Sequence, residues 1–174
     1  MAAFCPDLVG IETSDTPMKT FSRKAIKPDI TYYNSTRSSS KRADVESAEL
    51  MVEVKFSEQN DPYKDSPDDE GFLCDSDRAR QTLGQLTSYA TAHLAAQFRT
   101  RIFSILLFQK SARLMRWDRA GVIVSERILL DESELTQFFW RFSNATAKDR
   151  GHDPTVTSLT FTKDLTKEFL FDQL

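Results

Sequence analysis

Three charged residues in the first third of the chain have the types and spacing of a metal-dependent hydrolytic site. Asp29 begins one predicted strand, and Glu53 and Lys55 lie two residues apart on the next, so that both point to the same face. Carboxylate oxygens such as those of Asp29 and Glu53 are the hard ligands that Mg²⁺ takes. A bound Mg²⁺ polarises a phosphoryl oxygen and lowers the pKa of a water molecule. Lys55 would orient that water or stabilise the developing negative charge.

A second pair of polar side chains lies on a predicted helix further along the chain. Gln85 and Tyr89 are four residues apart, a spacing that places them on one helical face. There they could hold a nucleic-acid backbone or the water shell of the metal. Each signal also has a simpler structural explanation. A Glu-x-Lys pattern on a strand is most often a solvated face, and Gln85 would then make an ordinary surface hydrogen bond.

Two predicted strands and a helix must position these five residues. Residues 28–33 are β-prone after a proline, which suits the first position of a strand. Residues 49–56 form a compact apolar run whose period of two predicts a second strand. One face of that strand carries Leu50, Val52, Val54 and Phe56. Residues 78–98 follow the three-to-four spacing of a helix, and Ser76 and its acidic neighbours are candidate N-terminal caps.

Further strands and a second helix follow. Residues 101–108 are a dense apolar run that suits a strand buried on both faces. Residues 112–117 and 122–128 predict two more strands joined by a glycine-containing turn. Asp131 and Glu134 resemble a capping box. The helix after them has an apolar face, which carries Leu135, Phe138, Phe139 and Phe142. This order of elements predicts one mixed sheet with helices packed on it.

The Pro-Asp pair at 28–29, followed by Glu-Val-Lys at 53–55, resembles the signature of the PD-(D/E)xK nuclease superfamily. Gln-x-x-x-Tyr at 85–89 resembles the accessory motif of RecB-like members. The resemblance implies an α/β (α+β) fold over residues 26–148, with a mixed central sheet flanked by helices in a restriction-endonuclease-like arrangement. The residues it implies are Asp29 and Glu53 as ligands of Mg²⁺, and Lys55, Gln85 and Tyr89 as catalytic residues.

Two features of the sequence oppose nuclease activity. Residues 57–77, predicted to form a long loop, hold eight Asp or Glu against one Lys. So many acids directly after the metal-bearing strand would repel a polyanion unless the loop swings away. The first helix of the superfamily, which often carries a further acidic residue, is also hard to find. Glu12 is the only nearby candidate for that acid.

One feature favours nucleic acid as a partner. Residues 99–119 hold six Lys or Arg against one Asp, and would form a basic strip beside Trp117 if they projected from one edge. We prefer the alternative that Arg113, Arg116 and Arg119 are ordinary exposed residues of strands and turns.

Longer blocks of the sequence resemble the fungal-type protein kinase family. The matching text is Gln-Leu-Thr-Ser-Tyr-Ala at 85–90, Ile-Phe-Ser-Ile-Leu-Leu-Phe at 102–108, Ala-Arg-Leu-Met-Arg-Trp-Asp-Arg-Ala-Gly-Val at 112–122, Phe-Trp-Arg-Phe at 139–142 and Arg-Gly-His-Asp-Pro-Thr at 150–155. These blocks occur in the right order, and the resemblance covers roughly residues 26–160. It implies a region that lies ahead of the kinase domain of that family or at its beginning.

The motifs of kinase chemistry are missing from this chain. Phosphoryl transfer by a kinase needs a glycine-rich loop, a strand lysine, a catalytic Asp and a metal-binding Asp. The five glycines, at 10, 71, 84, 121 and 151, are too far apart to cradle a phosphate, and neither His-Arg-Asp nor Asp-Phe-Gly occurs. We therefore expect a truncated family protein that transfers no phosphate and acts as a regulatory or scaffolding nuclease-like module. The alternative is an Mg²⁺-dependent nuclease that acts on DNA or RNA.

The two ends of the chain are less determined. Residues 1–25 predict an entry segment with one short helix at most. Residues 149–174 predict a loop and a C-terminal helix that would link to a kinase domain, the expected partner. The chain ends within this helical pattern, which is why we expect a truncation. In a third hypothesis, the aromatic segment 169–171 binds another partner.

Composition indicates an intracellular protein. The formal net charge of −3 across 174 residues neither requires nor excludes nucleic acid. Two cysteines are too few for a disulfide scaffold. His93 and His152 lack a zinc-type spacing to other ligands, and we expect both to be ordinary surface or half-buried residues. The N-terminal residues lack the pattern of a signal peptide, and no apolar run approaches a membrane span. We therefore expect a cytoplasmic or nuclear location and no membrane partner.

Overall fold

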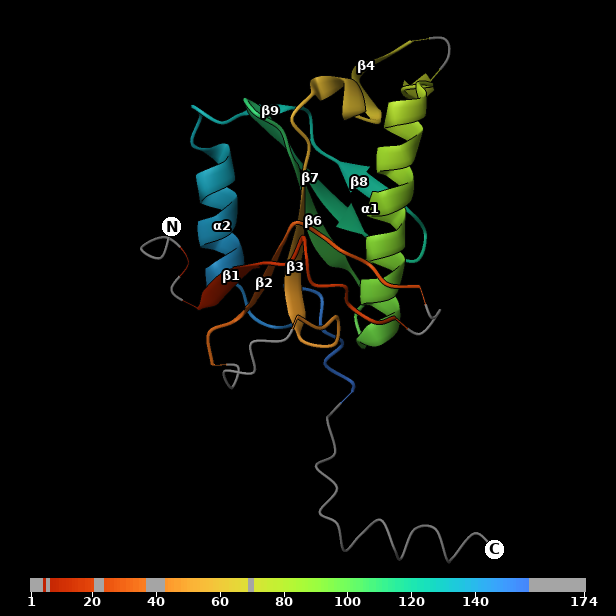
Figure 1. The fold of residues 1–174 in the computed structure, drawn as a ribbon. Helices are drawn as coiled ribbons and strands as arrows, with labels where there is room; N and C mark the ends of the chain where they lie inside the picture. Colours follow the sequence, from red (N-terminus) through yellow and green to blue (C-terminus); the bar gives the residue numbers. More distant parts are fainter. Residues whose placement is uncertain (1–4, 6, 21–23, 37–42, 69–70, 157–174) are drawn as a thin grey trace, which may run out of the picture.

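The described part of the chain folds into a mixed β-sheet with a helix on each face (Figure 1). The computed structural model describes residues 5, 7–20, 24–36, 43–68 and 71–156. The sheet order is β1-β2-β3-β6-β7-β8, with β9 pairing on β7. Its strands are β1 (Leu8–Glu12), β2 (Ile30–Asn34), β3 (Ala48–Val54), β6 (Ile102–Leu107), β7 (Ser111–Trp117), β8 (Val122–Val124) and β9 (Ile128–Leu129). The expected α+β class with a mixed central sheet is therefore confirmed.

One neighbouring pair of strands in this sheet is parallel. β3 and β6 run parallel, while every other neighbouring pair is antiparallel. A parallel pair needs a crossover connection, and helix α1 (Asp77–Ala96) supplies it. Ser76 caps α1, as its Oγ accepts a hydrogen bond from the Ala79 amide at 3.2 Å. The expected cap and helix are both confirmed.

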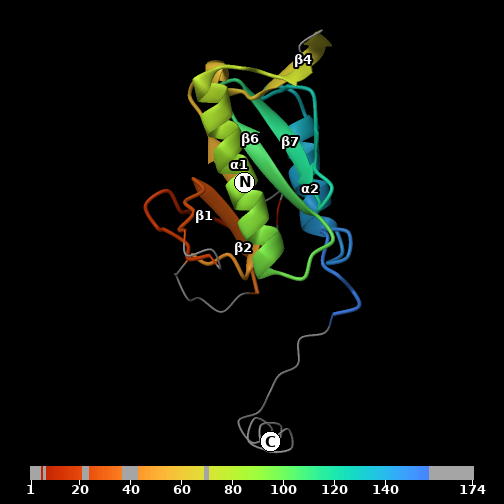
Figure 2. The same ribbon diagram turned by 90° about the vertical axis from the view of Figure 1, so that its right-hand side faces the viewer.

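Helices α1 and α2 (Glu134–Asn144) lie on opposite faces of the sheet, with α1 in front of it and α2 behind it in Figure 2. The apolar face of α2 packs Phe139 and Phe142 against Tyr32 and Val52. The buried face of α1, which includes Leu86, packs against the opposite face of the sheet in two clusters. Both faces of the central strands are therefore buried, so alternating residues of β3 point into different cores.

The expected entry segment contributes an edge strand rather than a short helix. β1 pairs antiparallel with β2, and Glu12 is the register partner of Ile30. The candidate acid Glu12 thus lies on a strand beside the start of β2, although a helix was expected there. Extended pairing prevails because Leu8 buries its side chain in the core on the α2 side of the sheet.

The acidic segment 57–77 is folded rather than a long loop. It contains a 3-10 turn, η1 (Glu58–Asn60), and a hairpin of β4 (Tyr63–Asp68) with β5 (Gly71–Leu73). Asp61 and Tyr63 are buried within it. The prediction failed because charge composition was taken as a sign of a solvated loop, whereas several of these acids have cationic partners.

Two element ends also differ from expectation. β3 ends at Val54, so Phe56 leaves the strand face it was predicted to share and is 88% exposed. Helix α2 begins with Ser133 as its N-cap and makes no side-chain cap hydrogen bond, so the expected capping box from Asp131 does not form. The predicted C-terminal helix and the segment 169–171 lie outside the described residues. Among the described helices, none is long and apolar enough to cross a membrane.

Candidate functional site

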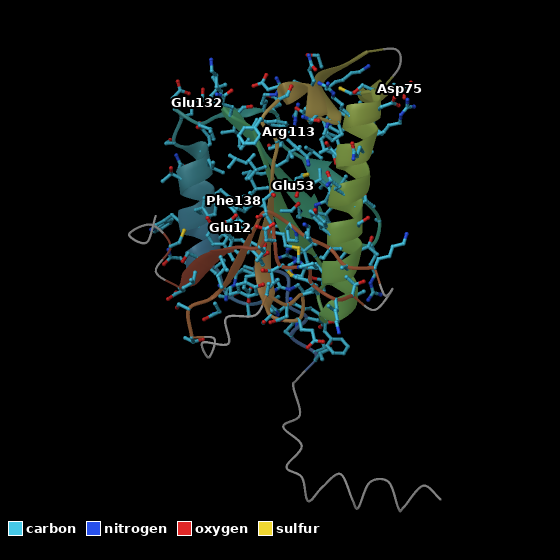
Figure 3. All side chains as sticks on the ribbon, in the orientation of Figure 1. Glu12, Glu53, Asp75, Arg113, Glu132 and Phe138 are labelled. Carbon is cyan, nitrogen blue, oxygen red and sulfur yellow. The ribbon has the colours of Figure 1, made fainter. Side chains whose placement is uncertain are left out.

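Asp29, Glu53 and Lys55 come together where β2 begins and β3 ends. The Lys55 ammonium donates to Glu53 Oε1 at 2.6 Å, and the Val54 amide donates to Asp29 Oδ2 at 2.7 Å. The antiparallel register pairs Ile30 with Val52, so Asp29 reaches the end of the neighbouring strand. In Figure 3, Glu53 lies between the two helices, below Arg113. The two carboxylates thus belong to one site.

Asp29 is held in place from two sides. On one side, the Thr13 amide donates to the Asp29 carbonyl at 2.8 Å, and the buried Thr13 hydroxyl donates to the Pro28 carbonyl at 2.6 Å. On the other, the Tyr89 hydroxyl donates to the Lys27 carbonyl at 2.9 Å. Thr13 was missed from sequence because the residue contacts its partners only through the pairing of β1 with β2.

Glu53 has an uncompensated oxygen. Its side chain is 4% exposed, and Oε2 has no hydrogen-bond partner among the described residues. Burial raises the pKa of the Glu53 carboxyl, and the charge of Asp29 raises it further, although the hydrogen bond and charge of Lys55 and the neighbouring Tyr89 hydroxyl oppose both. A buried acceptor without a donor is unfavourable, so an arriving cation would be stabilised here.

The two helical residues of the accessory motif have different surroundings. Tyr89 is buried, and burial together with the neighbouring Glu53 and Asp29 carboxylates raises the pKa of its hydroxyl. Its expected position beside the carboxylates is therefore found. Gln85 is half-buried one turn earlier on α1. Its amide makes no hydrogen bond to the described part of the chain.

The carboxylate pair fits a hard divalent cation. Across the described residues, no group of three or more His, Cys, Asp and Glu side chains is arranged to hold a metal ion. Mg²⁺ does not require such a group, because it retains several water ligands and is commonly bound through one or two carboxylates. The chemistry of the donors and the orphaned oxygen of Glu53 agree with such an ion.

Comparisons with known proteins add no identity. No family model matches this chain. No curated protein resembles it in sequence. The resemblances to the two families therefore remain predictions, and the geometry of the site has to support any function by itself.

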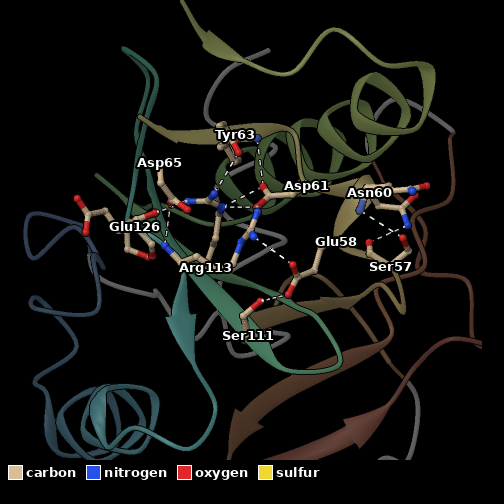
Figure 4. A network of polar contacts seen from close by, with 12 residues as sticks. Ser57, Glu58, Asn60, Asp61, Tyr63, Asp65, Ser111, Arg113 and Glu126 are labelled. Atoms are coloured by element: carbon tan, nitrogen blue, oxygen red, sulfur yellow. Dashed lines mark hydrogen bonds and ion pairs between the residues drawn. The ribbon is translucent and has the colours of Figure 1, made fainter. Parts of the chain in front are cut away.

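The alternative of a basic strip along residues 99–119 does not hold, because Arg99 and Arg113 are buried. Arg113 is fully buried and its Nε donates to both oxygens of Asp61, at 2.9 and 2.7 Å (Figure 4). Its other nitrogens donate to Asp65 Oδ1 at 2.7 Å and to the Tyr63 carbonyl at 3.0 Å. The preferred reading of Arg113 as an exposed residue is therefore wrong. It holds for Arg116 and Arg119, which are exposed.

Trp117 is not free to stack on a base. Its indole is buried, and Nε1 donates to the Ser104 hydroxyl at 2.8 Å. Its position on β7 turns the ring toward the core that α1 covers. The alternation of β7 places Arg113, Met115 and Trp117 on this side, and leaves Arg116 on the other.

A second ionic cluster surrounds Glu49 at the start of β3. Arg99 Nη2 donates to Glu49 Oε2 at 3.0 Å, and His152 Nε2 lies 3.3 Å from both oxygens. Burial opposes ionisation of Glu49, but His152 and the charges of Arg99 and Arg150 outweigh it and lower its pKa to about 2. This cluster ties the segment after α2 to the sheet.

His93 is fully buried rather than at the surface. Its Nε2 lies 2.8 Å from the Ala48 carbonyl, which makes Nε2 the protonated nitrogen of a neutral ring. Burial lowers the pKa of His93 to about 3, and the charge of Arg99 contributes. The polar type of the residue concealed this position, since it lies on the apolar face of α1.

Proposed function

We propose that this chain is a divalent-metal-dependent phosphodiesterase of nucleic acids, built on a restriction-endonuclease-like core. The observation that carries the proposal is the buried, partnerless oxygen of Glu53 beside Asp29 and Lys55. The order β1-β2-β3-β6, with α1 connecting the parallel pair, supports the fold assignment. The two acids would hold Mg²⁺ through one oxygen each.

The residues of the site divide the hydrolytic work between them. In the reaction, a water oxygen attacks phosphorus, the bond from phosphorus to the sugar oxygen breaks, and that oxygen takes a proton. Bound Mg²⁺ would supply charge that polarises the phosphoryl group and acidifies the water. The Lys55 ammonium would neutralise negative charge on the phosphoryl oxygens. Tyr89 and Thr13 would keep Asp29 at its place beside Glu53.

The acidic hairpin opposes this function less than the sequence indicated. Five acids of the segment 57–77 that contains it have arginine partners, and two of them, Asp75 and Asp77, pair with Arg80. Asp61 and Asp65 bind Arg113, and Glu58 accepts from Arg127 Nη1 at 3.1 Å. Neutralised acids repel a polyanion weakly, so the hairpin leaves room for a nucleic-acid substrate.

The proposal is tested by metal binding and cleavage in wild type and Glu53→Gln. Mn²⁺ or Mg²⁺ should raise the melting temperature of the wild type, because a ligand that binds only the folded state stabilises it. Glu53→Gln should abolish that shift and cleavage of DNA or RNA. Without metal the variant should be no less stable, since it removes a carboxylate whose pKa is raised by burial. Equal metal shifts in both proteins would refute the proposal.

A second candidate is a non-catalytic module of a fungal-type kinase protein, with the kinase domain as partner. It is favoured because one carboxylate oxygen of Glu53 and one of Asp29 already accept a hydrogen bond from the protein. Lys55 binds Glu53 Oε1, and the Val54 amide binds Asp29 Oδ2. A site neutralised in this way can persist as structure alone. Metal binding without cleavage, together with association with a separately expressed kinase domain, would select this candidate.

A further inference from the structure

A groove opens beside the proposed metal pair. It has a volume of about 930 Å³ and is lined by Tyr32, Val54 and Phe56 together with residues of β1. Its lining places it on the α2 side of the sheet, whereas Glu53 points to the α1 side. Asp29, at the start of β2, borders both the groove and the metal pair.

The walls of this groove are flat and apolar. Gly10 is the register partner of Tyr32, and a Cβ there would come within 2.9 Å of the Tyr32 ring. The missing side chain lets the backbone of β1 lie close to the buried Tyr32 ring, which lines the groove. Phe56 stands at the rim, 88% exposed and one residue beyond Lys55. An exposed phenylalanine next to a catalytic strand has no packing role, so its ring is available to a ligand.

The charge of the groove limits what can occupy it. The charged side chains of the described lining are Glu12 and Asp29, both acids. A phosphate would be repelled from the interior of the groove, whereas a neutral, flat group with apolar faces would be accepted. A nucleotide has both a charged phosphate and a flat, neutral base. Its phosphate can stay at the metal pair while its base enters the groove.

We propose that the groove binds one unpaired nucleobase next to the scissile phosphate, stacked on Phe56, so that the substrate class is single-stranded nucleic acid. This inference rests on the proposed function. Bases of a duplex are paired and stacked on one another, and their faces cannot reach an aromatic side chain unless the base is turned out. Stacking on aromatic residues is the usual way in which single strands are bound without sequence readout.

The inference is tested by binding of short oligonucleotides with Ca²⁺ in place of Mg²⁺. The probes are a thymidine oligomer, its duplex with a complementary strand, and an abasic strand of equal length. Wild type should bind the single strand more tightly than the duplex or the abasic strand. Phe56→Ala should weaken binding of the thymidine oligomer about tenfold and leave abasic binding unchanged. Phe98→Ala, at a phenylalanine that is 73% exposed just beyond α1, is the matched control and should change neither.

The outcomes separate this inference from the proposed function. Equal effects of Phe56→Ala on the thymidine and abasic strands, or no effect, would overturn the base groove while the Mn²⁺ shift of the wild type stayed intact. Failure of the wild type to bind any strand, or tighter binding of the duplex, would overturn it as well. If the wild type shows no Mn²⁺ shift of its melting temperature, but Phe56→Ala still weakens binding of the thymidine oligomer about tenfold, the metal site is refuted and the base-binding groove stands.

Discussion

Arg113 places a guanidinium in a part of the molecule that is closed to solvent. Each of its nitrogens has an acceptor, and the carboxylate of Asp61 takes two of the hydrogen bonds. Arg127 Nη2 approaches the same carboxylate at 2.9 Å. A buried charge is tolerated only where it is paired and hydrogen-bonded in this way. The network therefore fastens the acidic hairpin to β7.

Removing that guanidinium should destabilise the fold strongly. Arg113→Met leaves Asp61 buried with one cationic partner in place of two, and loss of a buried partner costs about 3–5 kcal/mol. Arg116→Met, on the exposed face of the same strand, should change the free energy of unfolding by less than about 0.5 kcal/mol. Urea denaturation of both variants measures the difference. Similar values for the two would show that the network contributes no more than a surface arginine.

Helix α1 joins the two parts of the candidate site, which are the carboxylates on the strands and Tyr89 on the helix. It carries Tyr89 to the Lys27 carbonyl and provides the crossover between the parallel strands β3 and β6. Its start is defined by the side-chain cap at Ser76. Helix α2 has a serine at the same position, Ser133, but that serine makes no cap hydrogen bond.

The two serines give a matched comparison of the helix ends. Ser76→Ala removes an acceptor from the Ala79 amide and should lower the free energy of unfolding by about 1 kcal/mol. Ser133→Ala should have an effect of only a few tenths of a kcal/mol, because no backbone amide of α2 donates to its side chain, and the bond it accepts from the Gln137 side chain is exposed. Thermal or urea unfolding of each variant checks the ranking. A larger loss for Ser133→Ala would contradict the assigned cap.

The stability of the folded protein should fall as the solution becomes acidic. The pKa of His93 is lowered by burial to about 3, so the unfolded chain takes up a proton below its ordinary pKa while the folded chain does not. This loss extends from about pH 6.5 down to about pH 3. Glu49, with a pKa lowered to about 2 despite its burial, adds a second loss from its usual value of 4.5 downward.

The contribution of His93 can be isolated by the slope of stability against pH. Each proton bound only by the unfolded state lowers the free energy of unfolding by about 1.4 kcal/mol per pH unit. His93→Gln should therefore have a flatter profile than the wild type between pH 6 and pH 5, whatever its stability at neutral pH. Urea titrations at half-unit intervals give the profile. Parallel profiles would mean that the folded chain accepts the proton on His93.

Local sequence patterns predicted the central strands, both helices, and four residues that meet in the candidate site. Hydrophobic periodicity is local, so the strands around residues 28–33 and 101–108 and the helix at 78–98 between them were predicted within a few residues. The alternation of side chains likewise put Glu53 and Lys55 on one face. Asp29 and Tyr89 were added by motif, and both lie beside Glu53.

Tertiary contacts, by contrast, determine which charged residues are buried and what surrounds them. Composition could not distinguish Arg113 from Arg116, because the difference depends on which face of β7 meets the acidic hairpin. It could not show that Thr13 holds Asp29, since that contact joins segments paired only in the sheet. The exposure of Phe56 follows from where β3 stops pairing. Each of these depends on long-range contacts, and a pattern of neighbouring residues carries no information about them.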